Sequence, residues 1–156
     1  MPRMTRRTLL LAATAGAPVS AADRSSQRFE IVRTDQEWRT ILTPEQYRVL
    51  WRHGTERAGS SPLNQEKRAG TFLCAACDLP LYSSAAKFDS GTGWPSFWDA
   101  IAGAVGTSTD RSFFMTRTEV HCRRCGGHLG HIFGDGPPPT GKRHCINGVA
   151  LQFRAD

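Results

Sequence analysis

Five cysteines divide this sequence into two kinds of chemistry. Four of them form two C-x-x-C pairs, Cys74–Cys77 and Cys122–Cys125, which are separated by a long insert, whereas Cys145 stands alone. Two such pairs are typical of a tetrahedral zinc site with four thiolate ligands, because each pair delivers two sulfurs to one ion. A site closed by four protein ligands is structural. The sequence therefore predicts one structural zinc ion and leaves Cys145 for chemistry.

The solitary thiol lies within residues 143–147, Arg-His-Cys-Ile-Asn. If this segment is extended, Arg143, Cys145 and Asn147 lie on the same side of the chain. A guanidinium near the thiol favours the thiolate, which is the nucleophilic form. Asn147 could orient a histidine or a substrate by hydrogen bonding. The alternative is that Cys145 is an inert residue buried in a strand.

Two histidines and a tryptophan are further candidates for the site. His128 and His131 are not needed for the zinc and lie in one glycine-rich segment, although either histidine alone could be a packing residue. Trp94, which follows a glycine and precedes Pro95, could present an aromatic wall to an apolar or sulfur-bearing group. It could equally belong to the core.

The elements that position these residues are predicted to be one helix followed by strands. Thr43 is a suitable N-cap, with Pro44 at the first helical position and Gln46 completing a capping box, and Gly54 ends the helix. Apolar alternation then predicts a mostly antiparallel β protein. The expected strands are 71–74, 79–83, 101–105, 112–120 and 145–154, with a glycine-rich turn over 126–136.

Residues 1–22 have the composition of an export signal. A basic start with Arg6 and Arg7 precedes a short apolar run of small residues and an A-x-A-like cleavage site. The run Thr-Arg-Arg-Thr-Leu-Leu at 5–10 resembles the twin-arginine export motif, which predicts a periplasmic protein. An ordinary Sec signal, an uncleaved anchor and a disordered basic tail are the alternatives. Residues 23–37 are then a linker or arm, and 38–156 form one domain.

Charge and hydropathy exclude several kinds of partner. The formal net charge is +6, and half of it comes from three arginines of the predicted signal. Because no dense basic cluster with interleaved aromatic residues follows, nucleic acid is not an expected partner. No stretch is long and apolar enough to span a bilayer as a helix, so no stable anchor is expected after cleavage. We expect a monomer.

Together these motifs resemble the methionine sulfoxide reductase B family. The similarity extends from about Trp38 to Phe153 with the motifs in the same order. It rests on the two C-x-x-C pairs, Gly-Trp-Pro-Ser-Phe at 93–97, His-Leu-Gly-His at 128–131, Phe-Gly-Asp-Gly-Pro at 133–137 and Arg-His-Cys-Ile-Asn at 143–147. The resemblance implies a mainly β fold of two small antiparallel sheets with an N-terminal helix. It also implies that the substrate is the R epimer of methionine sulfoxide, in oxidised proteins or free.

The resemblance also implies roles for individual residues. Cys145 matches the nucleophile, and Trp94 matches the aromatic wall that holds the substrate methyl group. His128 and His131 match the pair near the sulfoxide oxygen, of which one donates the proton that lets the oxygen leave. The products are methionine and a Cys145 sulfenic acid. The remaining matches are the supporting polar residues Arg143, Asp135 and Asn147, and the zinc ligands of many but not all members, Cys74, Cys77, Cys122 and Cys125.

One position departs from the pattern that many family members share. Thr92 stands where those members carry a second, resolving cysteine. The other cysteines are assigned to zinc, so no thiol of the same chain remains to trap the sulfenic acid. We therefore expect regeneration by an external thiol, either a thioredoxin-like protein or a small molecule.

Two other classes of protein compete with this interpretation. A zinc-knuckle β domain could be a binding module in which Cys145 is incidental, since fold alone does not decide function. The C-x-x-C pairs could instead be redox-active, as in a thiol–disulfide oxidoreductase, which stoichiometric zinc would exclude.

Overall fold

The computed structural model describes residues 29–156. The predicted signal at 1–22 and the beginning of the arm therefore lie outside the described residues. Two short helices precede the strands: α1 (Asp35–Ile41) and α2 (Pro44–Arg52). No helix in the described part of the chain has the length and apolar character needed to cross a membrane.

The helix predicted from the capping signals is α2. The Thr43 side chain accepts from the backbone of Gln46, whose own side chain accepts from the Thr43 N–H, so the capping box is confirmed. The C-cap, however, is His53 in the left-handed conformation, one residue before the predicted stop at Gly54. A second capping box between Thr34 and Glu37 begins α1, which the sequence analysis missed.

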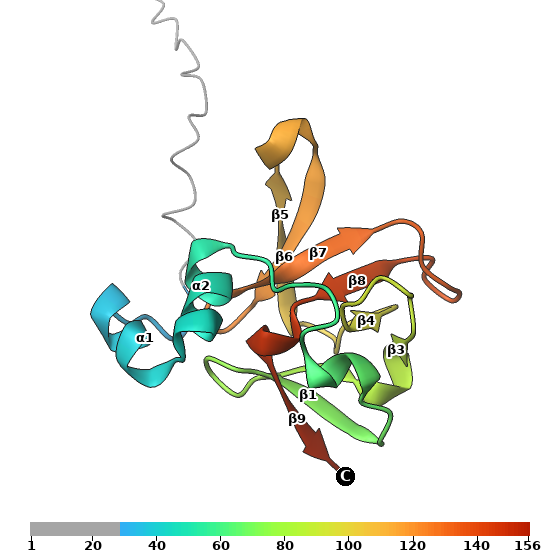
Figure 1. Cartoon of the computed structure of the whole chain (residues 1–156), viewed down its shortest axis with the longest axis horizontal. Helices are drawn as coiled ribbons and strands as arrows, with labels where there is room; N and C mark the ends of the chain where they lie inside the picture. Colours follow the sequence, from blue (N-terminus) through green and yellow to red (C-terminus); the bar gives the residue numbers. More distant parts are fainter. Residues whose placement is uncertain (1–28) are drawn as a thin grey trace, which may run out of the picture.

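The strands form two antiparallel sheets, which confirms the predicted fold class (Figure 1). The smaller sheet has the order β2-β1-β9, and the larger has the order β3-β4-β8-β7-β6-β5. Their bounds are β1 (Gly70–Cys74), β2 (Pro80–Ser83), β3 (Lys87–Phe88), β4 (Ser96–Phe97), β5 (Val105–Asp110), β6 (Arg117–Cys122), β7 (His128–Phe133), β8 (Arg143–Ile146) and β9 (Leu151–Ala155).

Several predicted boundaries are wrong. The expected strand over 145–154 is interrupted by a 3-10 turn at Gly148–Ala150, so β8 and β9 belong to different sheets. The glycine-rich segment expected to be a turn contains β7 at its centre. Glycine there has a packing role, because a Cβ on Gly130 would lie 2.0 Å from the Cys145 carbonyl oxygen on β8. The segment 101–104 is a turn that precedes β5.

A continuous apolar core joins the two sheets and the helices. Fully buried aromatic rings from both sheets meet in it, with Phe72 of β1 edge-on to Phe97 of β4 at 5.0 Å. Tyr82 of β2 stacks on the same Phe97 ring at 4.3 Å. These contacts fix the smaller sheet against β4, which is the neighbour of the Cys145 strand.

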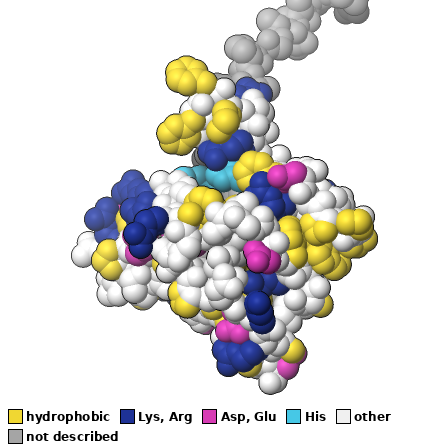
Figure 2. Space-filling model, turned by 45° about the vertical axis from the view of Figure 1, so that its right-hand side comes forward, with side chains coloured by type: hydrophobic (Ala, Val, Ile, Leu, Met, Phe, Trp, Pro, Cys, Tyr) yellow, Lys and Arg dark blue, Asp and Glu magenta, His cyan; other side chains and the backbone are white. Residues whose placement is uncertain are grey.

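The β5–β6 hairpin projects from the body of the molecule (Figure 1). In Figure 2 hydrophobic side chains gather on this projection, and histidine and basic side chains lie at its base. The most exposed large apolar side chains of the described chain include Phe113 and Phe114, which lie in the turn of this hairpin.

Candidate active site and metal site

The four paired cysteines come together at the knuckles that follow β1 and β6. Their sulfur atoms all lie within 4.8 Å of one another. The Cys74 and Cys125 sulfurs are 3.7 Å apart, and those of Cys77 and Cys122 are 3.5 Å apart. Four thiolates around zinc at about 2.3 Å place neighbouring sulfurs about 3.8 Å apart. The arrangement therefore fits the predicted metal site, and none of these cysteines is in a disulfide.

Cys145 lies on a different strand, in the interior of the larger sheet. It is directly opposite Ser96 of β4 on one side and His131 of β7 on the other. A strand paired on both sides holds the thiol in a fixed place, and the side chain remains partly accessible. Cys145 is thus a free thiol separate from the metal site, as predicted.

A cavity of about 270 Å³ opens over this thiol. Trp94 and Phe133 supply aromatic surface, and Arg117 and His131 supply polar groups. This is the form expected of a small-molecule site, which has apolar walls and a few convergent polar groups. The structure brings five predicted site residues to this cavity: Cys145, Trp94, His131, Arg143 and Asn147.

Arg143 approaches the thiol from the same strand, and its effect on acidity is smaller than that of burial. Burial raises the pKa of the Cys145 thiol, and the charge of Arg143 and hydrogen bonds from Thr92 and Arg143 offset this only in part. The prediction that the guanidinium favours the thiolate thus has the correct sign, but the net pKa lies above the ordinary value. Asp135 does not line the cavity; it is exposed and forms a bidentate ion pair with Arg143 at 2.9 and 3.2 Å.

His131 is held by a carboxylate that the sequence analysis did not identify. Its Nε2 lies 2.8 Å from Asp110 Oδ2, and the same oxygen accepts from Arg117 at 3.1 Å. Burial lowers the pKa of His131, and the hydrogen bond to Asp110 opposes this. Hydrogen bonds from Ser112 and His131 hold the pKa of Asp110 well below its usual range, so this acceptor is ionised.

His128 is placed differently from its partner in the sequence motif. Its side chain is only 2% exposed and does not line the Cys145 cavity. Its Nδ1 lies 3.0 Å from Oε1 of the buried Glu119, whose other oxygen binds His121 at 2.9 Å. The His128 and His131 rings remain neighbours, edge to face at 5.4 Å. The structure therefore brings His131 to the cavity over the thiol, whereas His128 lines an adjoining hollow.

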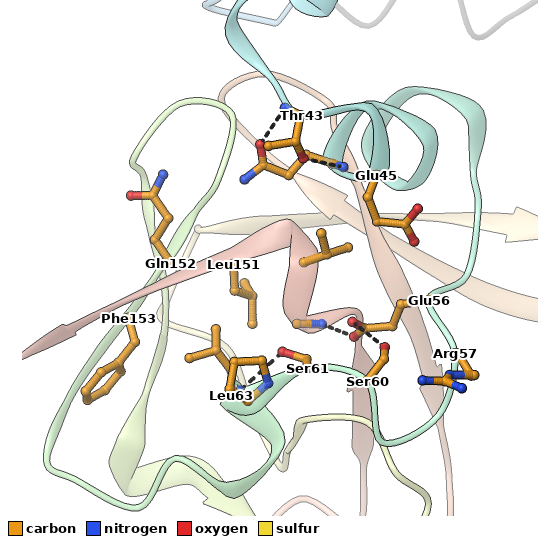
Figure 3. Close-up of a pocket in the computed structure, with 14 residues that line it drawn as sticks. Thr43, Glu45, Glu56, Arg57, Ser60, Ser61, Leu63, Leu151, Gln152 and Phe153 are labelled. Carbon is orange, nitrogen blue, oxygen red and sulfur yellow. Dashed lines mark hydrogen bonds between the residues drawn. The ribbon is translucent and has the colours of Figure 1, made fainter.

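Asn147 and Trp94 are joined by the segment that follows α2. Asn147 Oδ1 accepts from the Glu56 N–H at 2.9 Å, and Trp94 Nε1 donates to the Glu56 carbonyl at 3.1 Å. The Glu56 carboxylate is buried and accepts from the Gly148 N–H (Figure 3). Glu56 also lines a separate cavity, which Figure 3 shows. Glu56 thus holds both the indole of Trp94 and the side-chain amide of Asn147 in place.

The sequence analysis missed three carboxylates: Glu56, Asp110 and Glu119. Glu56 and Asp110 are far in sequence from Gly148 and His131, so no local spacing predicts those two pairings, whereas Glu119 is two residues from His121. The sequence feature that could have revealed them is a charged residue at a strand position that is expected to be buried. Glu119, which is 3% exposed and begins a run of four buried residues on β6, is an example.

The fold and site together define a β protein with a cluster of four thiols spaced as metal ligands and a separate thiol pocket. Residues 42–155 match the SelR domain family. The chain is 54% identical over 127 residues to "Peptide methionine sulfoxide reductase MsrB" of Methanosarcina barkeri, covering 81% of this chain and 89% of that protein. Proteins of the same name from Thiobacillus denitrificans and Pseudomonas putida are 56% and 55% identical over 78% and 80% of this chain, and 92% and 95% of their own. The chain belongs to the methionine sulfoxide reductase B family.

Proposed function

We propose that this protein reduces the R epimer of methionine sulfoxide to methionine and so repairs oxidised proteins. The observation that carries the proposal is the position of Cys145 opposite His131, in a cavity walled by Trp94. Three side chains then meet the three parts of the substrate: thiol to sulfur, imidazole to oxygen and indole to the methyl group. The relatives' name and the family match support the same reaction.

The reaction proceeds by attack of the Cys145 thiolate on the sulfoxide sulfur. Because an unprotonated oxide is a very poor leaving group, the oxygen must be protonated as the new bond forms. His131 is the proton donor that the geometry favours, since His128 does not reach the cavity. The sulfoxide becomes methionine, and the thiol becomes a sulfenic acid after transfer of the oxygen. Two external thiols then restore Cys145 and release water and a disulfide.

The metal in this proposal is a single structural zinc ion held by Cys74, Cys77, Cys122 and Cys125. Bound zinc would stabilise the two knuckles and, with four protein ligands, leave no position for substrate. Without a cation the four thiols do not ionise together, since hydrogen bonds between them raise the pKa of Cys74 and lower the pKa of Cys122. A divalent cation removes that difficulty because it stabilises the thiolates.

Location and reductant are part of the proposal. The twin-arginine-like segment at 1–22 supports export to the periplasm, and its route allows folding and metal loading before export. An external thiol, protein or small molecule, completes the cycle because Thr92 replaces a resolving cysteine. Isolation of the exported protein without zinc and with oxidised C-x-x-C pairs would contradict the export route.

A non-catalytic binding module is not favoured, because it does not need Cys145, His131 and Trp94 in one cavity.

The test is a turnover assay with separated R and S sulfoxides and dithiothreitol as reductant. Wild type is expected to reduce the R epimer alone. Cys145→Ser is expected to abolish turnover while its zinc content stays equal to that of wild type. Equal activity on both epimers, or turnover by Cys145→Ser, would refute the proposal.

A further inference from the structure

The turn of the β5–β6 hairpin exposes three consecutive apolar side chains. Phe113 is 80% exposed, Phe114 is fully exposed and Met115 is 52% exposed. A run of this kind on a projecting turn is a marker of an interaction surface. In Figure 2 the hydrophobic side chains on the projection lie above histidine and basic side chains.

The backbone under this surface is itself unfavourable. Phe113 and Phe114 have φ angles of 56° and 57°, in the left-handed region that bulky residues rarely occupy. Glycine or asparagine would fit these positions with less strain. Two adjacent aromatic residues in this conformation, exposed to solvent, contribute nothing to the core. Such outliers are characteristic of functional positions.

Another hollow lies between this turn and the Cys145 cavity. It has a volume of about 690 Å³ and is lined by Phe113, Arg111 and His53 among others. Three of its lining residues, Thr55, Arg117 and His131, also line the cavity over the thiol. The two hollows therefore adjoin at these three residues, and we call them together the groove between Cys145 and the turn.

We infer that this groove binds the polypeptide on either side of an oxidised methionine, and that Phe113 and Phe114 recognise an apolar neighbouring residue. This inference rests on the proposed function. The sulfoxide side chain enters the smaller cavity, so the backbone that carries it must leave along an open direction. The hollow toward the turn supplies that direction, and Phe113 lines its end at the turn. Free methionine sulfoxide has no group to reach it.

The expected occupant is an extended, locally unfolded segment with apolar residues next to the sulfoxide. Such a segment buries apolar surface against the exposed rings, whereas a polar segment gains nothing from them. The turn thus selects sulfoxides from normally buried sequence, which become accessible when an oxidised protein opens.

The test compares kcat/KM for three probes: free methionine-R-sulfoxide and two capped pentapeptides with the R-sulfoxide flanked by leucines or by serines. Wild type is expected to favour the leucine peptide. Phe113→Ser and Phe114→Ser are expected to lower kcat/KM for the leucine peptide by about 3- to 10-fold, as loss of roughly half the burial of one aromatic ring implies. Their values for the serine peptide and for the free substrate should be unchanged.

Controls are available elsewhere on the surface. Val32 and Ile41 are 80% and 53% exposed and line neither hollow, so Val32→Ser and Ile41→Ser should not change the ratio between the two peptides. Phe113→Gly relieves the backbone strain; it should keep or raise the midpoint of thermal unfolding and still lose the preference for leucine.

Two results would overturn the inference while leaving the proposed reduction intact. One is an unchanged leucine-to-serine ratio in the Phe113 and Phe114 variants when wild type is active. The other is a change of oligomeric state in these variants, by size-exclusion chromatography, with no change in peptide kinetics, which would assign the turn to contact between copies of the chain. Absence of all turnover in wild type would instead refute the proposed function.

Discussion

His131 and Cys145 are directly opposed residues of the adjacent antiparallel strands β7 and β8. Side chains in this relationship have Cβ atoms about 4.5–5.5 Å apart. An imidazole and a thiol at this spacing can contact the oxygen and the sulfur of the same sulfoxide group. Backbone pairing on both sides of β8 fixes this distance, and Asp110 fixes the ring. The proposed catalytic pair thus depends on the register of two strands.

Replacing His131 should affect chemistry more than stability. We expect His131→Gln to lower kcat on the R-sulfoxide by roughly 100- to 10,000-fold, the usual contribution of a positioned proton donor. His128→Gln should act mainly on the free energy of unfolding, because it disturbs the buried contact with Glu119. Single-turnover rates and thermal unfolding of both variants measure the difference. A larger loss of kcat in His128→Gln than in His131→Gln would show that His128, and not His131, donates the proton.

The acidity of Cys145 predicts how its reactivity depends on pH. Burial raises the pKa of this thiol above its ordinary value, so the thiolate fraction, and the rate of alkylation, should still be rising at alkaline pH. Arg143→Gln removes a charge that lowers this pKa and should move the profile to higher pH, whereas Arg143→Lys should move it less. The measurement is the rate of iodoacetamide labelling at Cys145 against pH, by mass spectrometry with Cys145→Ser as control. A midpoint below that of a free cysteine would contradict this prediction.

Local patterns predicted part of this fold. The C-x-x-C spacing and the Thr43 capping box each involve residues a few positions apart. The structure confirms that the four sulfurs cluster and that the capping hydrogen bonds form. The fold class and the placement of Cys145 in a strand were also correct.

The missed features depend on tertiary contacts. Glycines in β7 suggested a turn, yet the close approach of β8 to Gly130 is what requires glycine there. The alternation of apolar residues over 145–154 suggested one strand. It could not show that the chain turns at Asn147, where contacts with Glu56 hold it. The separate positions of His128 and His131 likewise depend on Glu119 and Asp110, which the motif does not contain.

Glu56 should be needed for both stability and catalysis. Glu56→Ala leaves the buried Gly148 N–H without its acceptor, which costs about 1–3 kcal/mol in the free energy of unfolding. The Asn147 turn should then loosen and lower kcat. Because burial raises the pKa of Glu56, a neutral substitute is tolerated, and Glu56→Gln should retain most of the stability. Urea unfolding and kcat report both effects; equal losses in the two variants would rule out the hydrogen-bond explanation.

Removing the metal should destabilise the whole domain. Loss of a structural metal belongs to the few changes that cost more than about 4 kcal/mol, which for a domain of this size lowers the unfolding midpoint by roughly 10–20 °C. We expect this result for Cys77→Ser and for chelator-treated wild type, with loss of bound zinc measured by elemental analysis. Cys145→Ser is the matched control and should keep both zinc and the midpoint. An unchanged midpoint after complete removal of zinc would show that the knuckles fold without it.

Thr92→Cys should convert the enzyme to internal regeneration. Thr92 lines the Cys145 cavity and lowers the pKa of its thiol, so a thiol at this position can condense with the sulfenic acid, forming a disulfide and releasing water. Without added thiol, both proteins should release one equivalent of methionine. Wild type should then hold a sulfenic acid that dimedone traps, whereas Thr92→Cys should hold an internal disulfide that dimedone does not label. Ser90→Cys, which lies outside the cavity lining, is the control and should behave as wild type. Dimedone labelling of oxidised Thr92→Cys at the wild-type level would show that residue 92 cannot reach the reacting sulfur.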